Sequence, residues 1–332
     1  MRILLALLLL LTTFLGSAQS IQILNSGTKS SLRGLSAIND QIIWVSGSNG
    51  TVGKSLDGGI TWRWFVVKDF EKAEFRDIEA FDENTAIIIA IASPAYILKT
   101  TDGGETWKQV YKNAQKDMFL DAIDFYDANN GIVVGDPIDG KLFLAKTIDG
   151  GNTWKDISTT IKAKPDSGEA FFASSGTNIK LINKKKFHFV SGGKASKYYN
   201  SNGAVTVLPL LQGQESTGAN SFATNGKKFI AVVGGDFNKK NDRIQNCIFS
   251  TDAGKTWKVP TVLPFGYRSC IDYISNSTWI TCGLNGVDIT SNNLSSFTHI
   301  SDEGFHVCKR SKYGSVVFLA GNNGKVARLI LN

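Results

Sequence analysis

Short apolar runs alternate with turn residues along almost the whole chain. Runs at residues 42–47, 86–90 and 131–135 are each followed, after a short interval with Gly, Asn or Pro, by another apolar run. Runs of this length that are rich in β-branched and aromatic residues predict strands. Because no long helical period follows the first 18 residues, the pattern predicts an all-β protein.

One eight-residue motif punctuates these strands. The pattern Ser/Thr-x-Asp-x-Gly-x-Thr-Trp occurs at residues 55–62, 100–107, 147–154 and 250–257. It predicts a hairpin in which the Asp side chain accepts hydrogen bonds from backbone N–H groups two residues on, Gly supplies a positive φ and Trp is buried between neighbouring sheets. We interpret the repeated residues as structural positions rather than catalytic acids or metal ligands: Asp57, Trp62, Asp102, Trp107, Asp149, Trp154, Asp252 and Trp257.

Two weaker copies complete the series, with Asn202 and Asn292 in place of Asp. The six positions are roughly 40–50 residues apart, which is the length of a four-stranded propeller blade. A seventh unit, which begins at Phe305, supplies only three strands, and residues 21–25 form an apolar strand without a blade of its own. The sequence therefore predicts a seven-bladed β-propeller of four-stranded antiparallel blades, closed by the N-terminal strand completing the last blade. The predicted blades cover residues 32–68, 75–112, 119–160, 169–210, 218–262, 267–300, and 305–331 plus 21–25.

The first 18 residues have the pattern of a secretory signal peptide. Arg2 precedes an apolar core at residues 3–11, and a small-residue cleavage site follows at residues 16–18. This core is shorter than the ~20 residues of a membrane-spanning helix, and no later segment is long and apolar enough to span a membrane. We expect cleavage after Ala18 and a single exported domain, residues 19–332, that is periplasmic or secreted.

Export would place the four cysteines where disulfides are permitted. Cys270 and Cys282 flank an expected hairpin turn at Asn276 and are candidates for a disulfide across it. The alternative is that all four, with Cys247 and Cys308, are small buried hydrophobic residues. The sequence leaves both alternatives open.

The repeats resemble a known group of proteins. The boxes at Asp57, Asp102, Asp149 and Asp252 match the Asp-box, or BNR, signature. The fuller unit, an aromatic-x-Asp-x-x-x-Phe segment followed by a Val-Gly strand and the box, resembles the photosystem II assembly or stability factor-like family. The resemblance implies a propeller that binds a protein or peptide as a scaffold. Asp boxes also occur in sialidases and other exported glycan-active proteins, so the motif alone does not decide the function.

The chain offers little material for catalysis. It contains 3 His and 2 Met, and we find no Arg-Ile-Pro segment before the first blade and no Tyr beside a Glu of the sialidase type. We also find no Gly-rich phosphate loop, HExxH, CxxC or nucleophile elbow. We expect no catalytic residue, no metal site and no cofactor, with a glycan-binding or glycan-cleaving propeller as the alternative. The net charge of +7 lies largely in Lys runs at expected turns, without interleaved aromatic residues, so we expect no nucleic-acid partner.

One group of basic residues is the candidate binding site. We align Arg33, Arg76 and Arg268 at the start of the innermost strand of their blades, with His306 as the matching residue of blade seven and Leu120 as the exception in blade three. In a propeller these positions surround one mouth of the central channel, where guanidinium groups favour a carboxylate, phosphate or acidic peptide. The alternative is local pairing, for example of Arg76 with nearby acidic residues. A second candidate is the long loop at residues 234–243, because long loops often carry function. We expect an exported, non-catalytic propeller that binds an acidic protein or peptide.

Overall fold

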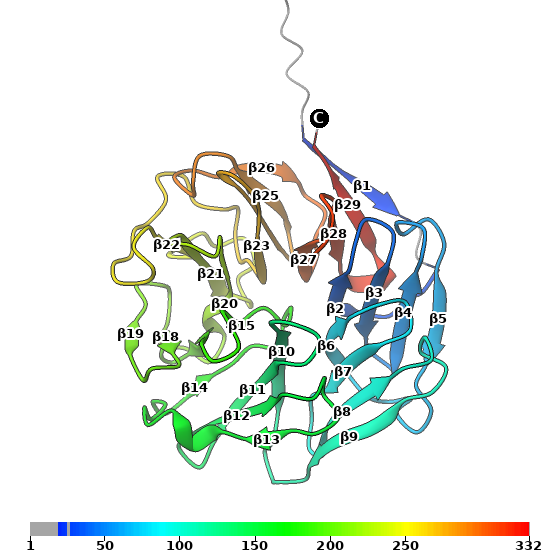
Figure 1. The fold of residues 1–332 in the computed structure, drawn as a ribbon. Helices are drawn as coiled ribbons and strands as arrows, with labels where there is room; N and C mark the ends of the chain where they lie inside the picture. Colours follow the sequence, from blue (N-terminus) through cyan, green and yellow to red (C-terminus); the bar gives the residue numbers. More distant parts are fainter. Residues whose placement is uncertain (1–18, 25–26, 332) are drawn as a thin grey trace, which may run out of the picture.

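The computed structural model, which describes residues 19–24 and 27–331, is a ring of seven antiparallel β-sheets around a central channel (Figure 1). Apart from two single-turn 3-10 segments, η1 (Ser158–Thr160) and η2 (Asn322–Gly324), its regular elements are strands. The all-β, seven-bladed prediction is confirmed. The expected signal peptide, residues 1–18, lies outside the described residues. No helix among the described residues is long and apolar enough to cross a membrane.

Blades one to three are regular four-stranded sheets whose strands follow in chain order from the channel outward. Blade one contains β2 (Leu32–Ala37), β3 (Ile43–Gly47), β4 (Thr51–Ser55) and β5 (Arg63–Val66). Blade two contains β6 (Phe75–Ala80), β7 (Ala86–Ala90), β8 (Ala95–Thr100) and β9 (Lys108–Asn113). Blade three contains β10 (Leu120–Phe125), β11 (Gly131–Ile138), β12 (Lys141–Thr147) and β13 (Lys155–Asp156).

Blades four and five depart from this regularity. Blade four contains β15 (Ile179–Leu181), β16 (Phe187–Val190), β18 (Lys197–Asn200) and β19 (Val205–Val207), so its inner strand begins later than the expected residue 169. Blade five contains β20 (Thr217–Thr224), β21 (Ile230–Asp236) and β22 (Cys247–Ser250), and the short strands β14 (Glu169–Ala170) and β17 (Gly192–Gly193) extend its sheet. Its outermost position is reduced to a single bridge between Phe249 and Lys258.

Blade six contains β23 (Cys270–Ser275), β24 (Thr278–Gly283), β25 (Gly286–Thr290) and β26 (Thr298–Ser301). Blade seven contains β27 (Val307–Arg310), β28 (Val317–Ala320) and β29 (Val326–Ile330), followed on its outer side by β1 (Ser20–Leu24). Each of these two blades is a complete antiparallel sheet.

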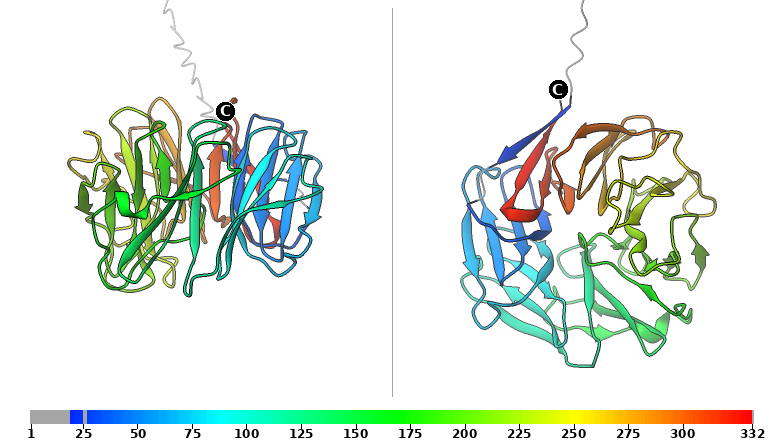
Figure 2. Two further views of the ribbon diagram at one scale, coloured as in Figure 1. Left: turned by 60° about the horizontal axis from the view of Figure 1, so that its bottom comes forward. Right: turned by 180° about the vertical axis from the view of Figure 1, so that it is seen from behind.

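The two ends of the described chain close the ring. β1 lies antiparallel to β29, with Ser20 opposite Ile330 and Leu24 opposite Val326, and Figure 2 shows the two strands side by side. Ile21 and Leu24 pack against the core that blades six, seven and one share. The predicted closure is therefore confirmed for residues 20–24, and residue 25 of the predicted strand lies outside the described residues.

The Asp boxes hold the outer hairpins. In blade two, the Thr100 hydroxyl donates to the Asp102 carboxylate at 2.8 Å, and Asp102 accepts the backbone N–H of Thr106 at 3.0 Å. The N–H therefore comes from four residues on rather than the predicted two. These hydrogen bonds stabilise the ionised form and lower the pKa of Asp102 to about 2. The Trp that ends each box is partly buried against the core between neighbouring blades, as Trp107 is.

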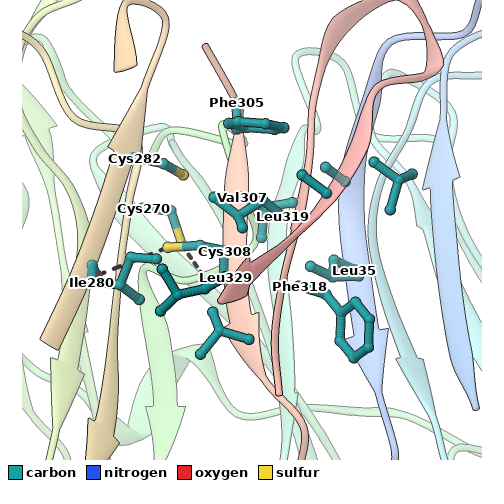
Figure 3. Close-up of a cluster of buried hydrophobic side chains, with 14 of the residues drawn as sticks. Leu35, Cys270, Ile280, Cys282, Phe305, Val307, Cys308, Phe318, Leu319 and Leu329 are labelled. Atoms are coloured by element: carbon teal, nitrogen blue, oxygen red, sulfur yellow. Dashed lines mark hydrogen bonds between the residues drawn. The ribbon is translucent and has the colours of Figure 1, made fainter. Parts of the chain in front are cut away.

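The cysteines are buried free thiols. Cys270 and Cys282 occupy directly opposite positions on β23 and β24, and Cys308 of β27 lies beside them in the core between blades six and seven (Figure 3). The Cys270 thiol lies 3.2 Å from the carbonyl oxygen of Cys308. A Cys270–Cys282 disulfide is thus not formed in this structure, although the predicted pairing of positions across the hairpin is present. The reduced thiols act here as small hydrophobic side chains.

Candidate functional site

The inner strands begin at one mouth of the channel, which we call the arginine mouth, and end at the opposite mouth. Near its start, the inner strand of four blades carries an extra residue relative to the next strand. Such β-bulges redirect a side chain from the regular alternation of a strand. The extra residues are polar or charged: Arg33, Arg76, Asp121 and Asn220.

Arg33 and Arg76 are neighbours at this mouth, as predicted. Both are only partly buried, and the Arg33 Nη1 donates to the carbonyl oxygen of Ser174 at 3.3 Å. Burial and the adjacent Arg76 lower the pKa of Arg33 to about 10. Among the described residues no carboxylate lies within 4 Å of Arg33, whereas the Arg76 Nε is 3.7 Å from Glu74. Arg33 is therefore a cation without a direct counter-charge, beside a second guanidinium.

His306 lies near the two arginines as a neutral, buried side chain. Burial and the charges of Arg33 and Arg76 lower the pKa of His306 to about 4. Its Nε2 lies 2.8 Å from the side-chain oxygen of Asn322 and 3.3 Å from the Ser31 hydroxyl. His306 thus shapes the mouth without adding charge at neutral pH.

Arg268 does not belong to the mouth, so this part of the prediction is corrected. The backbone N–H of Arg268 bonds to a carbonyl near the end of the second strand of the preceding blade, as those of Leu32 and Phe305 do. It therefore matches the residue before Arg33 or His306, and a shift of one residue along a strand turns a side chain to the other face. Its guanidinium is fully buried and donates through Nε to Asp288 at 2.6 Å. In blade three the residue at the bulge is Asp121, not Leu120.

Asp121 places a carboxyl group close to Arg76. Its carboxyl group is fully buried, and burial together with the nearby Asp136 raises its pKa well above the usual range, while Arg76 opposes this shift. Burial raises the pKa of Asp136 to about 6. The basic surface is thus confined to blades one and two. The sequence analysis missed Asp121 because it matched Leu120, rather than Asp121, to Arg33 and Arg76.

A segment that the sequence analysis did not identify fills the channel. Residues 172–178, which we call the plug, cross from blade four to inner strands on other sides of the ring. Ser174 accepts from Arg33 of blade one and donates to Asn220 of blade five, and the Ser175 hydroxyl donates to the carbonyl of Ser269 in blade six. A run of small, mostly polar residues is the feature of the sequence that could have marked this segment.

Gly176 is the point at which the plug meets blade two. Gly176 has a φ of +65°, and a Cβ there would lie 2.0 Å from the Asp77 carboxyl carbon. The Asp77 side chain is fully buried, and burial raises its pKa to about 7. Because the plug contacts blades one, two, five and six, it separates the two mouths.

The long loop predicted at residues 234–243 lies on the face of the arginine mouth. β21 continues to Asp236, and Phe237 then packs edge-on against Phe172 of the plug, with ring centroids 5.7 Å apart. The Arg243 guanidinium lies over the Phe265 ring, 4.2 Å from its centroid. The loop is therefore anchored to blades four and six.

Residues 77–185 match the family model described as photosynthesis system II assembly factor YCF48. The chain resembles this family. No curated protein matches the sequence significantly. The resemblance predicted from the Asp boxes is thus confirmed.

Solved structures support the propeller fold of this chain. A structure described as YCF48 bound to D1 peptide has a TM-score of 0.66 at 15% identity, covering 94% of this chain and 95% of that one. YCF48 from Cyanidioschyzon merolae has a TM-score of 0.62 at 16% identity, covering 94% and 98%. The WD40 propeller domain of Doa1 has a TM-score of 0.63 at 14% identity, covering 95% and 98%. At these identities the likeness establishes the propeller fold.

A Tyr and a Glu that the sequence did not bring together do meet in the structure. Tyr199 donates to Glu169, whose side chain is buried and also lies 2.9 Å from the Lys197 ammonium. A nucleophilic Tyr–Glu pair must reach its substrate. This pair is inside the core, where it joins β18 of blade four to β14 in the sheet of blade five rather than forming a sialidase-like site.

Proposed function

We propose that the chain is an exported scaffold or assembly factor that binds an acidic segment of a protein at the arginine mouth and carries out no chemistry. The observation that carries this proposal is the juxtaposition of Arg33 and Arg76, of which Arg33 has no carboxylate within 4 Å among the described residues. A carboxylate from a partner would relieve the repulsion between the two guanidinium groups and accept bidentate hydrogen bonds.

The surroundings of the two arginines favour a peptide over an isolated anion. Ser31, Asn322 and Ser174 offer hydroxyl and amide groups near Arg33, and the partly exposed Phe237 packs against the plug on the same face. Polar groups around a charged anchor, with an aromatic side chain nearby, are typical of protein interfaces. That a YCF48 structure is described as bound to D1 peptide supports a peptide partner for this chain. The signal-peptide pattern at residues 1–18 supports export.

Affinity capture tests the proposal. The mature protein is immobilised and exposed to envelope extract beside a variant that carries Arg33→Gln and Arg76→Gln. The matched control is Arg63→Gln, because Arg63 is an exposed arginine on the outer strand β5 that pairs with Glu105. We expect a stoichiometric protein that wild type and the control retain and the double variant loses. Equal retention by all three forms, or retention by none, would refute binding through the arginine mouth.

A further inference from the structure

The opposite mouth of the channel contains a separate cavity. It has a volume of about 460 Å³ and is lined by residues at the ends of the inner strands of all seven blades. Gly176 and Thr177 of the plug also line it, so the plug lies between this cavity and the arginine mouth. A volume of this size lies in the usual range of about 300–1,000 Å³ for small-molecule sites.

The walls of this cavity carry charged groups of both signs. Its lining includes three carboxylates, those of Glu79, Asp124 and Asp272, and the Asp77 carboxyl group lies just behind them. Three lysines and one arginine also line it: Lys180, Lys309, Lys312 and Arg310. A cationic ligand would be repelled by the lysines and an anionic one by the carboxylates. The cavity therefore favours a neutral ligand.

Two of the lysines have unused hydrogen-bonding capacity. The Lys180 ammonium is 3.6 Å from Asp124, and that of Lys309 is 3.7 Å from Asp77. Both separations exceed hydrogen-bond length, and neither ammonium has a hydrogen-bond acceptor among the described residues. A hydroxyl group suits such a gap, because it accepts from an ammonium and donates to a carboxylate at the same time.

The carboxylates have a structural role that explains why they are there. Asp124 accepts the backbone N–H of Leu181 in the next blade at 2.6 Å, and Asp272 accepts that of Arg310 at 2.7 Å. Each therefore joins two neighbouring inner strands while one of its faces remains toward the cavity. Lys312 is likewise engaged, because its ammonium donates to Glu79 and to the carbonyl oxygen of Ala80. Lys180 and Lys309 are therefore the residues that a ligand would engage.

Tyrosines stand at the rim. Tyr126 is 50% exposed and Tyr313 is 82% exposed, and both line the cavity. A flat aromatic ring offers an apolar face to a ligand whose edges are polar. A saccharide ring combines such an apolar face with a periphery of hydroxyl groups. We propose that the opposite mouth is a binding site for a neutral saccharide, independent of the protein-binding site at the arginine mouth.

Saturation-transfer NMR and calorimetry test this assignment. The probes are glucose, galactose, N-acetylglucosamine and maltose, with putrescine and acetate as charged comparisons. We expect at least one saccharide to bind with millimolar affinity, and Lys180→Met to weaken it about 10-fold, which is the effect of losing one or two hydrogen bonds. Tyr313→Ala, which removes a side chain that is 82% exposed, should weaken it as well.

The controls separate this site from other sources of binding. Lys184→Met changes a lysine of the same blade that is 66% exposed and lies outside the cavity, and it should leave the affinity unchanged. The double variant Arg33→Gln, Arg76→Gln should also bind the saccharide normally, whatever happens to the protein partner. Binding of none of the saccharides, binding that Lys180→Met does not alter, or preferential binding of putrescine or acetate would overturn the proposal.

Discussion

Arg268 and Asp288 form a fully buried ion pair inside blade six, with the Arg268 Nε 2.6 Å from the Asp288 carboxylate. The guanidinium also donates to the carbonyl of Tyr267 and to the side chain of Asn285. His299 lies 3.0 Å from the other carboxylate oxygen of Asp288. The pair thus ties β25 to the segment before β23 and leaves Arg268 without a role at the channel mouth.

Replacing Arg268 should therefore lower the stability of the folded protein rather than remove the binding site for the partner. Arg268→Gln leaves the Asp288 carboxylate buried without its partner, which typically costs about 3–5 kcal/mol. Urea unfolding measures this loss. The exposed Arg63 serves as the comparison, and Arg63→Gln should change stability by less than about 1 kcal/mol. If Arg268→Gln were as stable as wild type and failed to bind the partner, Arg268 would belong to the mouth after all.

Closure of the ring by β1 should account for a large part of the stability. Deleting residues 20–24 exposes the edge of β29 and uncovers the core beneath Ile21 and Leu24, so we expect the melting temperature to fall by roughly 10 °C or more. Leu24→Asp should reproduce much of this loss. Ile23→Asp should have little effect, because Ile23 is 50% exposed. Thermal unfolding followed by circular dichroism distinguishes these cases, and a truncated protein that melts like wild type would contradict the closure.

The plug has no room for a larger side chain at Gly176. Gly176→Ala places a methyl group on the Asp77 carboxyl and a side chain at a φ of +65°, so we expect a loss of roughly 3 kcal/mol or more. Gly140 is the matched control, since it has a φ of +69° but no heavy atom within 4 Å of an added Cβ. Gly140→Ala should cost only the backbone strain, about 1 kcal/mol. Similar unfolding free energies for the two variants would show that the plug yields to the added methyl group.

The Asp boxes should make stability depend on pH in the acid range. Hydrogen bonds from Thr106 lower the pKa of Asp102 to about 2 in the folded protein, below its unfolded value of about 3.9. Its stabilisation is therefore complete above about pH 4 and is lost as the pH falls through about 2. Since Asp102 is exposed, solvent screening reduces the effect to about 1 kcal/mol. Asp102→Asn should be less stable than wild type by this amount at pH 6 and equally stable near pH 2. If Asp102→Asn were less stable than wild type by the same amount at both pH values, ionisation of the Asp102 carboxylate would not be the source of the stabilisation.

The sequence predicted the fold in detail because its signals are local. Each Asp box contains its own hydrogen bonds, so the motif predicts the hairpin, and the spacing of the boxes predicts the blades. The incomplete seventh unit and the unassigned strand at residues 21–25 together predicted the closure. Blade four was less predictable, since its box is weak and its inner strand begins only after the plug.

The candidate site was predicted only in part because it depends on register. The sequence analysis brought Arg33, Arg76 and His306 together correctly. It placed Arg268 among them because it aligned Arg268 with the bulge residues Arg33 and Arg76, whereas the backbone hydrogen bonds match Arg268 to the residue before Arg33. It could not indicate that burial leaves His306 neutral, nor that residues 172–178 cross the channel, because both depend on contacts between distant blades.

Binding of a synthetic peptide at the arginine mouth is the most direct test of the proposed function. Fluorescence anisotropy compares an acidic peptide from the captured partner with the same peptide in which Asp and Glu are replaced by Asn and Gln. We predict that wild type and Arg63→Gln bind the acidic form at least about 10-fold more tightly than the neutral form, and that salt weakens this preference. The double variant Arg33→Gln, Arg76→Gln should lose the preference. If wild type bound both peptides equally, or the double variant kept the preference, the arginine mouth would not be the site.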